Sequence, residues 1–328
     1  MTIKEVARIA GVSPAAVSRY LNGGPLSGEK RDRIAAAIKE TGYRPNLMAQ
    51  TMRTGKIHQI GVIVPRIYSE SVSRLLEGIT QETASRDYLS VIGWAGGRAE
   101  QEIQYLNILQ DNRVAGIILM GTAMDDALRR AIDTMNIPVV VTGQQFKGLP
   151  CVYHDDLGAM HELAQRMIAK GYSRIGYIGV REEDEAVGQR RRIGAQKALQ
   201  EAGMDAGEMP YVVARTFDAV SGYEKMNELL EKHPGLNGVL CATDTLALGA
   251  MKALREHGLR IPQDMGIAGI GGSWIDEIPS PTLTSIHYHY RKCGVMAARL
   301  LFARIENDVS LPGDQIMLDY DYVEGGSM

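Results

Sequence analysis

The sequence has 328 residues, of which 45% are hydrophobic and 23% charged, and its formal net charge is −3. This balance is typical of folded domains with a sizeable core and excludes a disordered or collagen-like chain. No apolar run approaches the roughly 18 residues of a membrane span, and no apolar leader is present, so we expect a cytoplasmic protein. Three widely spaced cysteines, Cys151, Cys241 and Cys293, predict reduced thiols rather than a disulfide framework.

Charge is distributed unevenly along the chain. Residues 1–56 hold ten Lys and Arg against four Asp and Glu, a net +6, whereas the remainder holds 26 against 35, a net −9. A basic head on an acidic body predicts a polyanionic partner for the head alone. From charge alone, a solvated basic surface is an equal alternative.

The head contains three short helical patterns. Residues 2–10 have apolar side chains at helical spacing, and Gly11 interrupts the pattern. Ser13 is a typical N-cap and Pro14 suits the first helical position, so a second helix is expected over about 14–21. A third helix follows the next glycine-rich loop. Two helices joined by a tight glycine turn predict a helix-turn-helix unit.

The second helix of such a unit enters the major groove of DNA with its first turns. Arg19 can form the bidentate contact to guanine, and Ala15 and Ala16 can touch thymine methyl groups. Polar side chains nearby would bond phosphates and set the register. An ordinary surface arginine is the alternative for Arg19. The predicted DNA contacts of the head are Thr2, Ser13, Pro14, Ala15, Ala16, Ser18, Arg19 and Asn22.

The segment after Pro45 predicts a short conditional helix. Asn46 can cap it, and about seven helical residues are marginal in water, so we expect it to fold only against a partner. Met52, beside Arg53, can wedge between base steps in the minor groove, with core packing as the alternative. The predicted DNA contacts here are Asn46, Ala49, Met52 and Arg53.

From residue 59 onward, apolar runs alternate with helical patterns. The runs are 59–64, 88–93, 114–120, 137–143, 174–180, 238–242 and 266–270. Near-continuous apolar strands between helices predict parallel sheets covered on both faces, an α/β fold. Because the alternation restarts near residue 160, we expect two doubly wound subdomains with a cleft between them.

Several segments resemble the lactose/galactose repressor (LacI/GalR) family. They are TIKEVARIAGVSPAAVSRYLNG, GYRPNLMAQTMR, IGVIVP, VLCATDTLALGAMKAL and PTLTSI, in the family's order along essentially the whole chain. The resemblance implies heads that bind a palindromic operator as a homodimer, a hinge helix, and a body like periplasmic sugar-binding proteins that holds a small effector. Family tetramers end in a leucine heptad, and the final residues VEGGSM are not one, so a dimer is expected.

The resemblance also implies domain boundaries. The implied units are a helix-turn-helix domain over residues 1–45, a hinge helix and linker over 46–58, an N-terminal effector-binding subdomain over 59–156 and 287–316, and a C-terminal one over 157–286 and 317–328.

Matching the family's motifs residue by residue implies part of an effector site. Arg191, in RRRIGA, matches an arginine that grips sugar hydroxyls, and Phe217 an aromatic residue that stacks on a pyranose. Thr243 and Asp244, in ATDTLALG, match a polar pair near the cleft, with helix capping as the alternative for Asp244. The family's aspartate after the next strand is absent, and we expect Trp274 to supply that contact.

Arg66 follows the first body strand, where the cleft of an open α/β sheet has its mouth. With several other segments, it makes the chain similar to a family member that recognises a phosphorylated disaccharide. Arg66 and Arg191 could clamp a phosphate bidentately, with Ser69 or Ser71 donating a hydroxyl. Gln144 stands where a charged contact is expected, so a neutral sugar or other small ligand stays open, as does a mobile surface loop for Arg66.

Enzyme chemistry is not indicated. The sequence has no nucleophile elbow, and its glycines near residue 270 do not complete a dinucleotide fingerprint, so no catalytic residue or cofactor is predicted. The spacing of His287, His289 and Cys293 fits no common metal site and predicts packing near the subdomain hinge.

Together these patterns predict a sequence-specific DNA-binding regulator, a repressor of a carbohydrate operon, whose partners are double-stranded operator DNA and a sugar or sugar-phosphate effector. We expect the effector to act by changing the separation of the hinge segments across the dimer. A co-repressed regulator that needs its ligand to bind DNA, and a sugar-binding protein without a transcriptional role, are the alternatives.

Overall fold

The computed structural model describes residues 1–21, 23–43, 58–121, 123–306 and 315–328. The chain divides into two compact units, residues 1–57 and residues 58–328, and each is described by itself. Within the described ranges, every helix is too short or too polar to cross a lipid bilayer.

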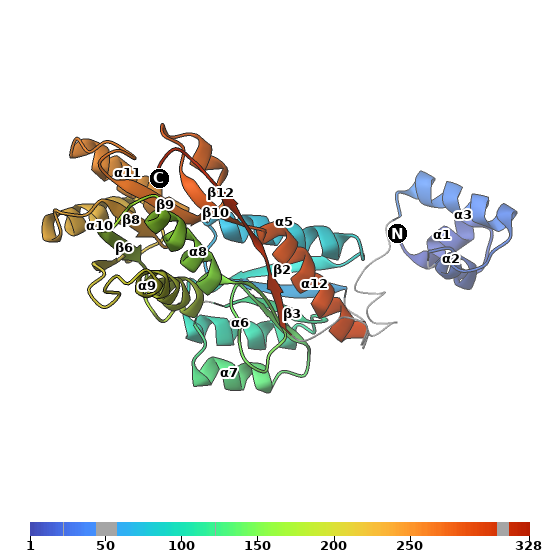
Figure 1. The fold of residues 1–328 in the computed structure, drawn as a ribbon. Coiled ribbons are helices and arrows are strands. Elements are labelled where there is room, and N and C mark those ends of the chain that lie inside the picture. The colour runs from blue at the N-terminus through green and yellow to red at the C-terminus, as the bar shows by residue number, and fades with distance from the viewer. Residues whose placement is uncertain (22, 44–57, 122, 307–314) are drawn as a thin grey trace. The chain divides into compact units, whose positions relative to one another are not determined.

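Three helices form the first unit (Figure 1): α1 (Ile3–Ala10), α2 (Pro14–Leu21) and α3 (Gly28–Thr41). A capping box begins α1, because the Thr2 hydroxyl accepts from the Glu5 amide while the Glu5 carboxylate accepts from the Thr2 amide at 2.6 Å. Gly11 ends α1 in the left-handed region, with φ 61°. Arg33 of α3 donates to the carbonyls of Ala10 and Gly11 and ties the third helix to this turn. The predicted helix-turn-helix head is confirmed.

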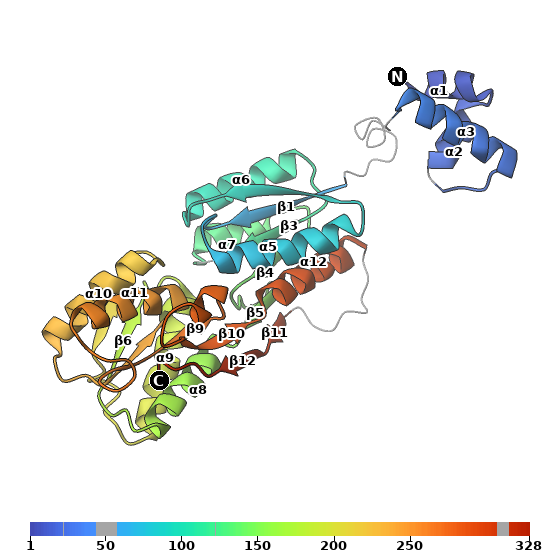
Figure 2. The ribbon, with the colours of Figure 1, turned by 90° about the horizontal axis from the view of Figure 1, so that it is seen from above.

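The second unit contains two six-stranded sheets (Figures 1 and 2). The first has the order β11-β5-β4-β3-β1-β2, and all its neighbouring strands are parallel. Its strands are β1 (Gln59–Val64), β2 (Leu89–Trp94), β3 (Ile117–Met120), β4 (Val139–Thr142), β5 (Cys151–His154) and β11 (Gln315–Leu318).

The second sheet has the order β12-β10-β9-β8-β6-β7 and is parallel except for β12, which runs antiparallel to β10. Its strands are β6 (Ile175–Gly179), β7 (Tyr211–Val213), β8 (Gly238–Cys241), β9 (Gly266–Gly271), β10 (Thr284–Tyr288) and β12 (Tyr320–Val323).

Helices cover both faces of each sheet, as Figure 2 shows for the first. Around the first sheet lie α5 (Glu70–Ala84), α6 (Ala99–Asp111), α7 (Asp126–Asp133) and α12 (Tyr290–Glu306). Around the second lie α8 (Asp156–Ala169), α9 (Arg191–Glu201), α10 (Ala219–Lys232) and α11 (Asp244–Glu256), with a π-helical turn η1 (Glu185–Arg190) and a 3-10 turn η2 (Trp274–Glu277). In β1, Val62 packs toward α5 and α12 and Ile63 toward α6, because successive strand residues face opposite sides. The predicted α/β class with two parallel-sheet subdomains is confirmed.

The chain crosses between the subdomains three times, after β5, after β10 and after β11. At these crossings the ring of His154 stacks on that of Tyr288, with centroids 4.3 Å apart. Residues 287–288 belong to a strand of the second sheet and residues 317–318 to a strand of the first, two residues from the predicted boundaries. The functional domain limits otherwise stay a prediction. All three cysteines are buried free thiols, and Cys293, in α12, contacts Thr142 at the end of β4.

Candidate functional site

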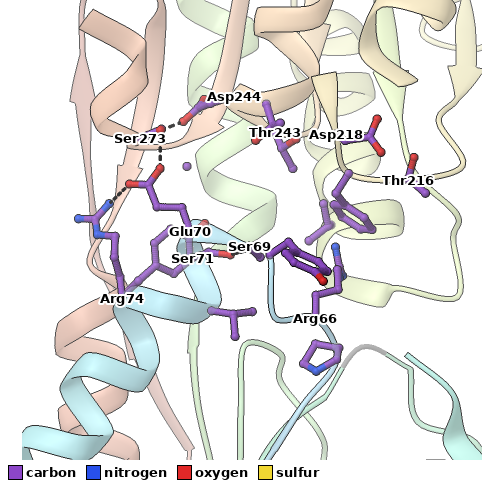
Figure 3. A pocket seen from close by; sticks show the side chains of 18 of the residues that line it. Arg66, Ser69, Glu70, Ser71, Arg74, Thr216, Asp218, Thr243, Asp244 and Ser273 are labelled. Atoms are coloured by element: carbon purple, nitrogen blue, oxygen red, sulfur yellow. Dashed lines mark hydrogen bonds and ion pairs between the residues drawn. The ribbon is translucent and has the colours of Figure 1, made fainter. Parts of the chain in front are cut away.

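A cavity of about 480 Å³, the outer chamber, is lined by residues that follow strands of both sheets (Figure 3). An inner chamber of about 120 Å³ shares Arg66, Ser71 and Arg191 with it and adds Gln144 and His154. The carboxyl ends of parallel strands are where ligands bind in open α/β sheets. The outer chamber also has a volume typical of small-molecule sites, so the two chambers are the candidate ligand site.

Arg66 joins the two subdomains at the entrance to the inner chamber. Its guanidinium lies 3.6 Å from the ring centroid of Phe217 and 3.7 Å from the Asp184 carboxylate, both contributed by the second subdomain. Burial lowers the pKa of Arg66, and the Asp184 charge opposes that shift. One face of Phe217 is therefore covered by a cation of the same chain.

Asp184 begins the turn η1 and is the partner that holds Arg66. Its carboxylate accepts from the Val187 amide at 3.1 Å and from the Gln144 side chain at 3.3 Å. Burial raises the pKa of Asp184 to about 6, and the Val187 amide and Arg66 limit the rise. Because Gln144 and Arg66 belong to the first subdomain, Asp184 links the two sides of the cleft.

Arg191 lines both chambers and is only 4% exposed. It donates to the Asp156 carboxylate at 2.7 Å and to the Ala242 carbonyl, while the Tyr288 hydroxyl donates to Asp156 at 3.0 Å. Burial alone would lower the pKa of Arg191, but the Asp156 charge and hydrogen bond, together with Tyr288 and Tyr290, outweigh it and raise that pKa. The guanidinium is thereby held charged and in one orientation at the cavity wall.

The sequence left open whether Asp244 caps the helix that follows, and the structure gives the capping role to Thr243. Thr243 is the N-cap of α11, and its hydroxyl accepts from the Leu246 amide. Asp244 is buried and accepts from the Ser285 hydroxyl at 2.7 Å and the Gly272 amide at 2.6 Å. Asp276, in the turn η2, lies near Asp244. Burial and the Asp244 charge raise the pKa of Asp276 to about 9, so Asp276 keeps its proton near neutral pH. Asp244 thus anchors the loop after β9 instead of capping the helix.

A second set of contacts crosses the cleft at the start of α5, and the dashed line between Ser273 and Glu70 in Figure 3 marks one of them. The Ser273 hydroxyl donates to the Glu70 carboxylate at 2.5 Å, and Arg74 donates to the Gly272 carbonyl at 2.6 Å. Arg74 also pairs with Glu70 at 3.8 Å. These contacts connect the first subdomain to the same loop that Asp244 holds.

The structure brings together all the predicted effector residues except Trp274. Those that line the chambers are Arg66, Ser69, Ser71, Gln144, Arg191, Phe217, Thr243 and Asp244. Trp274 is 68% exposed and lies outside the lining, because the chain turns at Gly272, with φ 76°, and presents Ser273 to the cavity. Ser273 lines the cavity next to the position where Trp274 was expected, and the contact of Trp274 with an effector stays a prediction.

Sequence reasoning missed several other residues that line the outer chamber: Glu70, Arg74, Trp94, Asp218 and Tyr290. Trp94 ends β2 and Asp218 follows β7, so the rule that sites form at the carboxyl ends of parallel strands could have identified both. Glu70 and Arg74 lie on one helix face, and only the fold shows that this face borders the cleft.

In the head, the predicted DNA contacts fall into two groups. Pro14, Ala15 and Arg19 are exposed and Ser18 is partly exposed, while the Ser13 hydroxyl accepts from the Ala16 amide at 3.2 Å. Ala16 is only 7% exposed and packs with Val17 in the small core of the head, which corrects the prediction that it touches a base. Asn22, Asn46, Ala49, Met52 and Arg53 lie outside the described residues, as does the expected hinge helix.

Two family models match the chain. Residues 2–46 match the bacterial regulatory proteins of the lacI family, and residues 164–328 match a periplasmic binding protein-like domain. The sucrose operon repressor of Staphylococcus xylosus is 30% identical over 308 residues, which are 94% of each chain. The chain belongs to the LacI family. This LacI-family protein is a DNA-binding transcriptional regulator, and because similar proteins are regulators, the prediction that it is not an enzyme is confirmed.

Solved structures agree with this LacI-family assignment. A lac repressor dimer bound to operator and the anti-inducer ONPF superposes with a TM-score of 0.90 over 100% of this chain and 98% of the other, at 22% identity, which shows the shared fold. A complex of the transcriptional regulator CelR with cellobiose has a TM-score of 0.75 at 27% identity, with complete coverage of both chains.

Proposed function

We propose that this LacI-family regulator represses a carbohydrate operon and that a carbohydrate bound in the two chambers releases it from its operator. The observation that carries the proposal is a cavity at the carboxyl ends of two parallel sheets, in a chain that begins with a helix-turn-helix head. Its wall combines an aromatic side chain, Trp94, with polar groups such as Asp218, Ser273 and Arg191. Such a wall suits a ligand with an apolar ring face and many hydroxyl groups.

The head supports the DNA-binding half of the proposal. Arg19 and Ala15 are exposed on α2, the helix that would enter the major groove. We propose Arg19 as the reader of guanine, and Thr2, Ser13 and Ser18 as phosphate contacts. Two heads of a homodimer would bind the two halves of a palindromic operator in the cytoplasm, with the hinge residues in the minor groove.

The contacts across the cleft suggest how the effector acts. Asp184 joins the subdomains on one side of the cavity, and Ser273 with Glu70 joins them on the other. A carbohydrate that enters must replace or add to these contacts, and so favours one subdomain orientation over the other. It can shift that equilibrium only by its differential affinity for the two orientations.

A narrower proposal concerns the operon. The segments CVYHDDLGAM, GQRRR and LCATDTLALGA, with Arg66, are similar to the trehalose operon repressor, which recognises a phosphorylated disaccharide. Arg66 lines the cavity wall, but its guanidinium is already paired with Asp184, so its position alone does not favour an anionic ligand. The sucrose operon repressor is also a close match along the chain, so trehalose is one candidate among several sugars.

Selection of inverted-repeat duplexes by the full-length dimer, followed by fluorescence anisotropy, tests the function. We expect binding that weakens steeply with salt, because Lys and Arg of the head release counterions from the DNA. Adding the correct carbohydrate should weaken operator binding. Tightening would identify the co-repressed alternative, and no duplex preference with or without carbohydrates would overturn the proposal.

A further inference from the structure

Every arginine that lines the chambers, in the part of the chain that the structure describes, already has a carboxylate partner. The pairs are Arg66 with Asp184 at 3.7 Å, Arg74 with Glu70 at 3.8 Å, and Arg191 with Asp156 at 2.7 Å. A phosphate group would therefore have to compete with an internal anion at each of the three cations.

The cavity wall also contains carboxylates beyond these pairs. Asp218 lines the outer chamber, and the amide of Ser221 that donates to it at 2.7 Å lowers the pKa of this carboxylate, so it is ionised at neutral pH. Even without the buried Asp244, the lining has four carboxylates for three arginines. The net field in the chambers opposes a dianionic ligand and favours hydroxyl groups, which can donate to the carboxylates.

Asp184 is the carboxylate that decides whether Arg66 is available. In this pair Arg66 is the more exposed residue, with 34% of its side chain exposed against 13% for Asp184. The Arg66 guanidinium also stacks on Phe217. Asp184 is kept in place by the Val187 amide and Gln144. An anionic ligand at Arg66 would lie beside this fixed charge, and the repulsion is strong because little water screens it.

We propose that the cavity selects uncharged carbohydrates and excludes phosphorylated ones, and that Asp184 determines this specificity. The inference rests on the proposed function, since it names the chemical class of the effector. It chooses between the neutral and the phosphorylated ligand, both of which are compatible with the sequence.

Measured affinities of the full-length protein test the proposal. The probes are sucrose, trehalose, cellobiose and maltose, compared at pH 7.5 with sucrose 6-phosphate, trehalose 6-phosphate and inorganic phosphate by isothermal titration calorimetry. We expect at least one neutral disaccharide to bind, and its phosphorylated form to bind at least 10-fold more weakly. Asp184→Asn should narrow that ratio at least 10-fold. Glu183→Gln removes a charge from an exposed neighbour in the same loop and should leave the ratio unchanged.

A measurement on the wild-type chain covers the case in which Asp184→Asn fails to fold. Asp184 is faced by Arg66, Arg191 and Asp156, and its pKa of about 6 means that it gains a proton as the pH falls from 7.5 to 5.5. Glucose 6-sulfate keeps a constant charge over this range. We expect its affinity relative to glucose to rise at least threefold at pH 5.5.

The outcomes separate the two proposals. If a phosphorylated disaccharide binds more tightly than its neutral form at pH 7.5, or if neither Asp184→Asn nor the lower pH changes the ratio, the selectivity inference is overturned and the proposed function stands. If no carbohydrate of either class binds, both are overturned.

Discussion

The ion pair between Asp156 and Arg191 offers the sharpest test of how the cavity wall is built. Both side chains are only 4% exposed, and their atoms meet at 2.7 Å. Asp156→Asn removes the negative charge but keeps the shape, and it leaves the Arg191 cation buried without compensation. Breaking a buried pair by removing one partner costs about 3–5 kcal/mol. Since whole-domain stabilities are about 5–15 kcal/mol, the loss is a large fraction of the total.

Urea unfolding followed by tryptophan fluorescence measures this loss in the correct part of the molecule. The chain has two tryptophans, Trp94 and Trp274, and both belong to the second unit, so the signal reports that unit and not the head. With a denaturant slope of about 3 kcal/mol per molar, the midpoint should fall by about 1 M or more. Asp133→Asn breaks a surface pair with Arg129 and should cost only about 0–1 kcal/mol.

The double variant Asp156→Asn with Arg191→Gln adds a second criterion. Because it removes both charges, it should be less destabilised than the sum of the two single variants. If Asp156→Asn shifts the midpoint no more than Asp133→Asn does, the buried pair is not the feature that holds this wall, and the reasoning fails.

Three further predictions concern the head, the crossings between the two subdomains, and helix packing. Arg19→Ala should reduce discrimination between the selected operator and a duplex with altered half-site guanines by about 1–3 kcal/mol, measured by anisotropy; unaltered discrimination would show that another residue reads the bases. Burial lowers the pKa of His154 to about 3, so its side chain stays neutral in the folded chain. In the unfolded chain it takes up a proton below about pH 6.5, and the free energy of unfolding therefore decreases as the pH falls below that value. When the pH falls from 7.5 to 5.5, the free energy of unfolding of His154→Phe, measured with urea, should therefore decrease by about 1.4 kcal/mol less than that of the wild type. Equal decreases would contradict this. Gly249→Ala would place a Cβ against the Ala219 carbonyl and should lower stability by about 1–3 kcal/mol. Gly235→Ala should not, because the added Cβ would lie 3.9 Å from its nearest atom, on the Arg174 side chain. Similar thermal midpoints for the two variants would count against close α10–α11 packing.

Local chemistry accounts for the parts of the fold that could be predicted from the sequence. The second helix of the head was expected over about 14–21 and is found at Pro14–Leu21, because Ser13 and Pro14 are strong start signals. The run 59–64 coincides with β1, because a buried parallel strand needs apolar side chains on both faces. The short strands β7, with three residues, and β12, which Asp321 interrupts, were not predicted, because their apolar runs are too short to stand out in the sequence.

Ala16 and Trp274 show where such reasoning ends. Ala16 sits on the helix that was correctly predicted, yet its orientation depends on where α1 and α3 pack, and it faces the core. Trp274 follows the correct strand, but a positive φ at Gly272 brings Ser273 to the cavity in its place. In both cases the direction in which a side chain points depends on the fold, and a linear pattern does not contain it.

The sequence by itself determined the helices of the head and the longer apolar strands of the two sheets, because caps, turns and apolar periodicity act over a few neighbouring positions. Most of the predicted cavity residues came from the resemblance to the LacI/GalR family. Only the tertiary structure decided that Asp184 neutralises Arg66 and that Asp156 holds Arg191, since these partners are 118 and 35 positions apart. Charge balance in a cavity depends on which side chains converge in space, and that convergence comes from the folding of two sheets against each other.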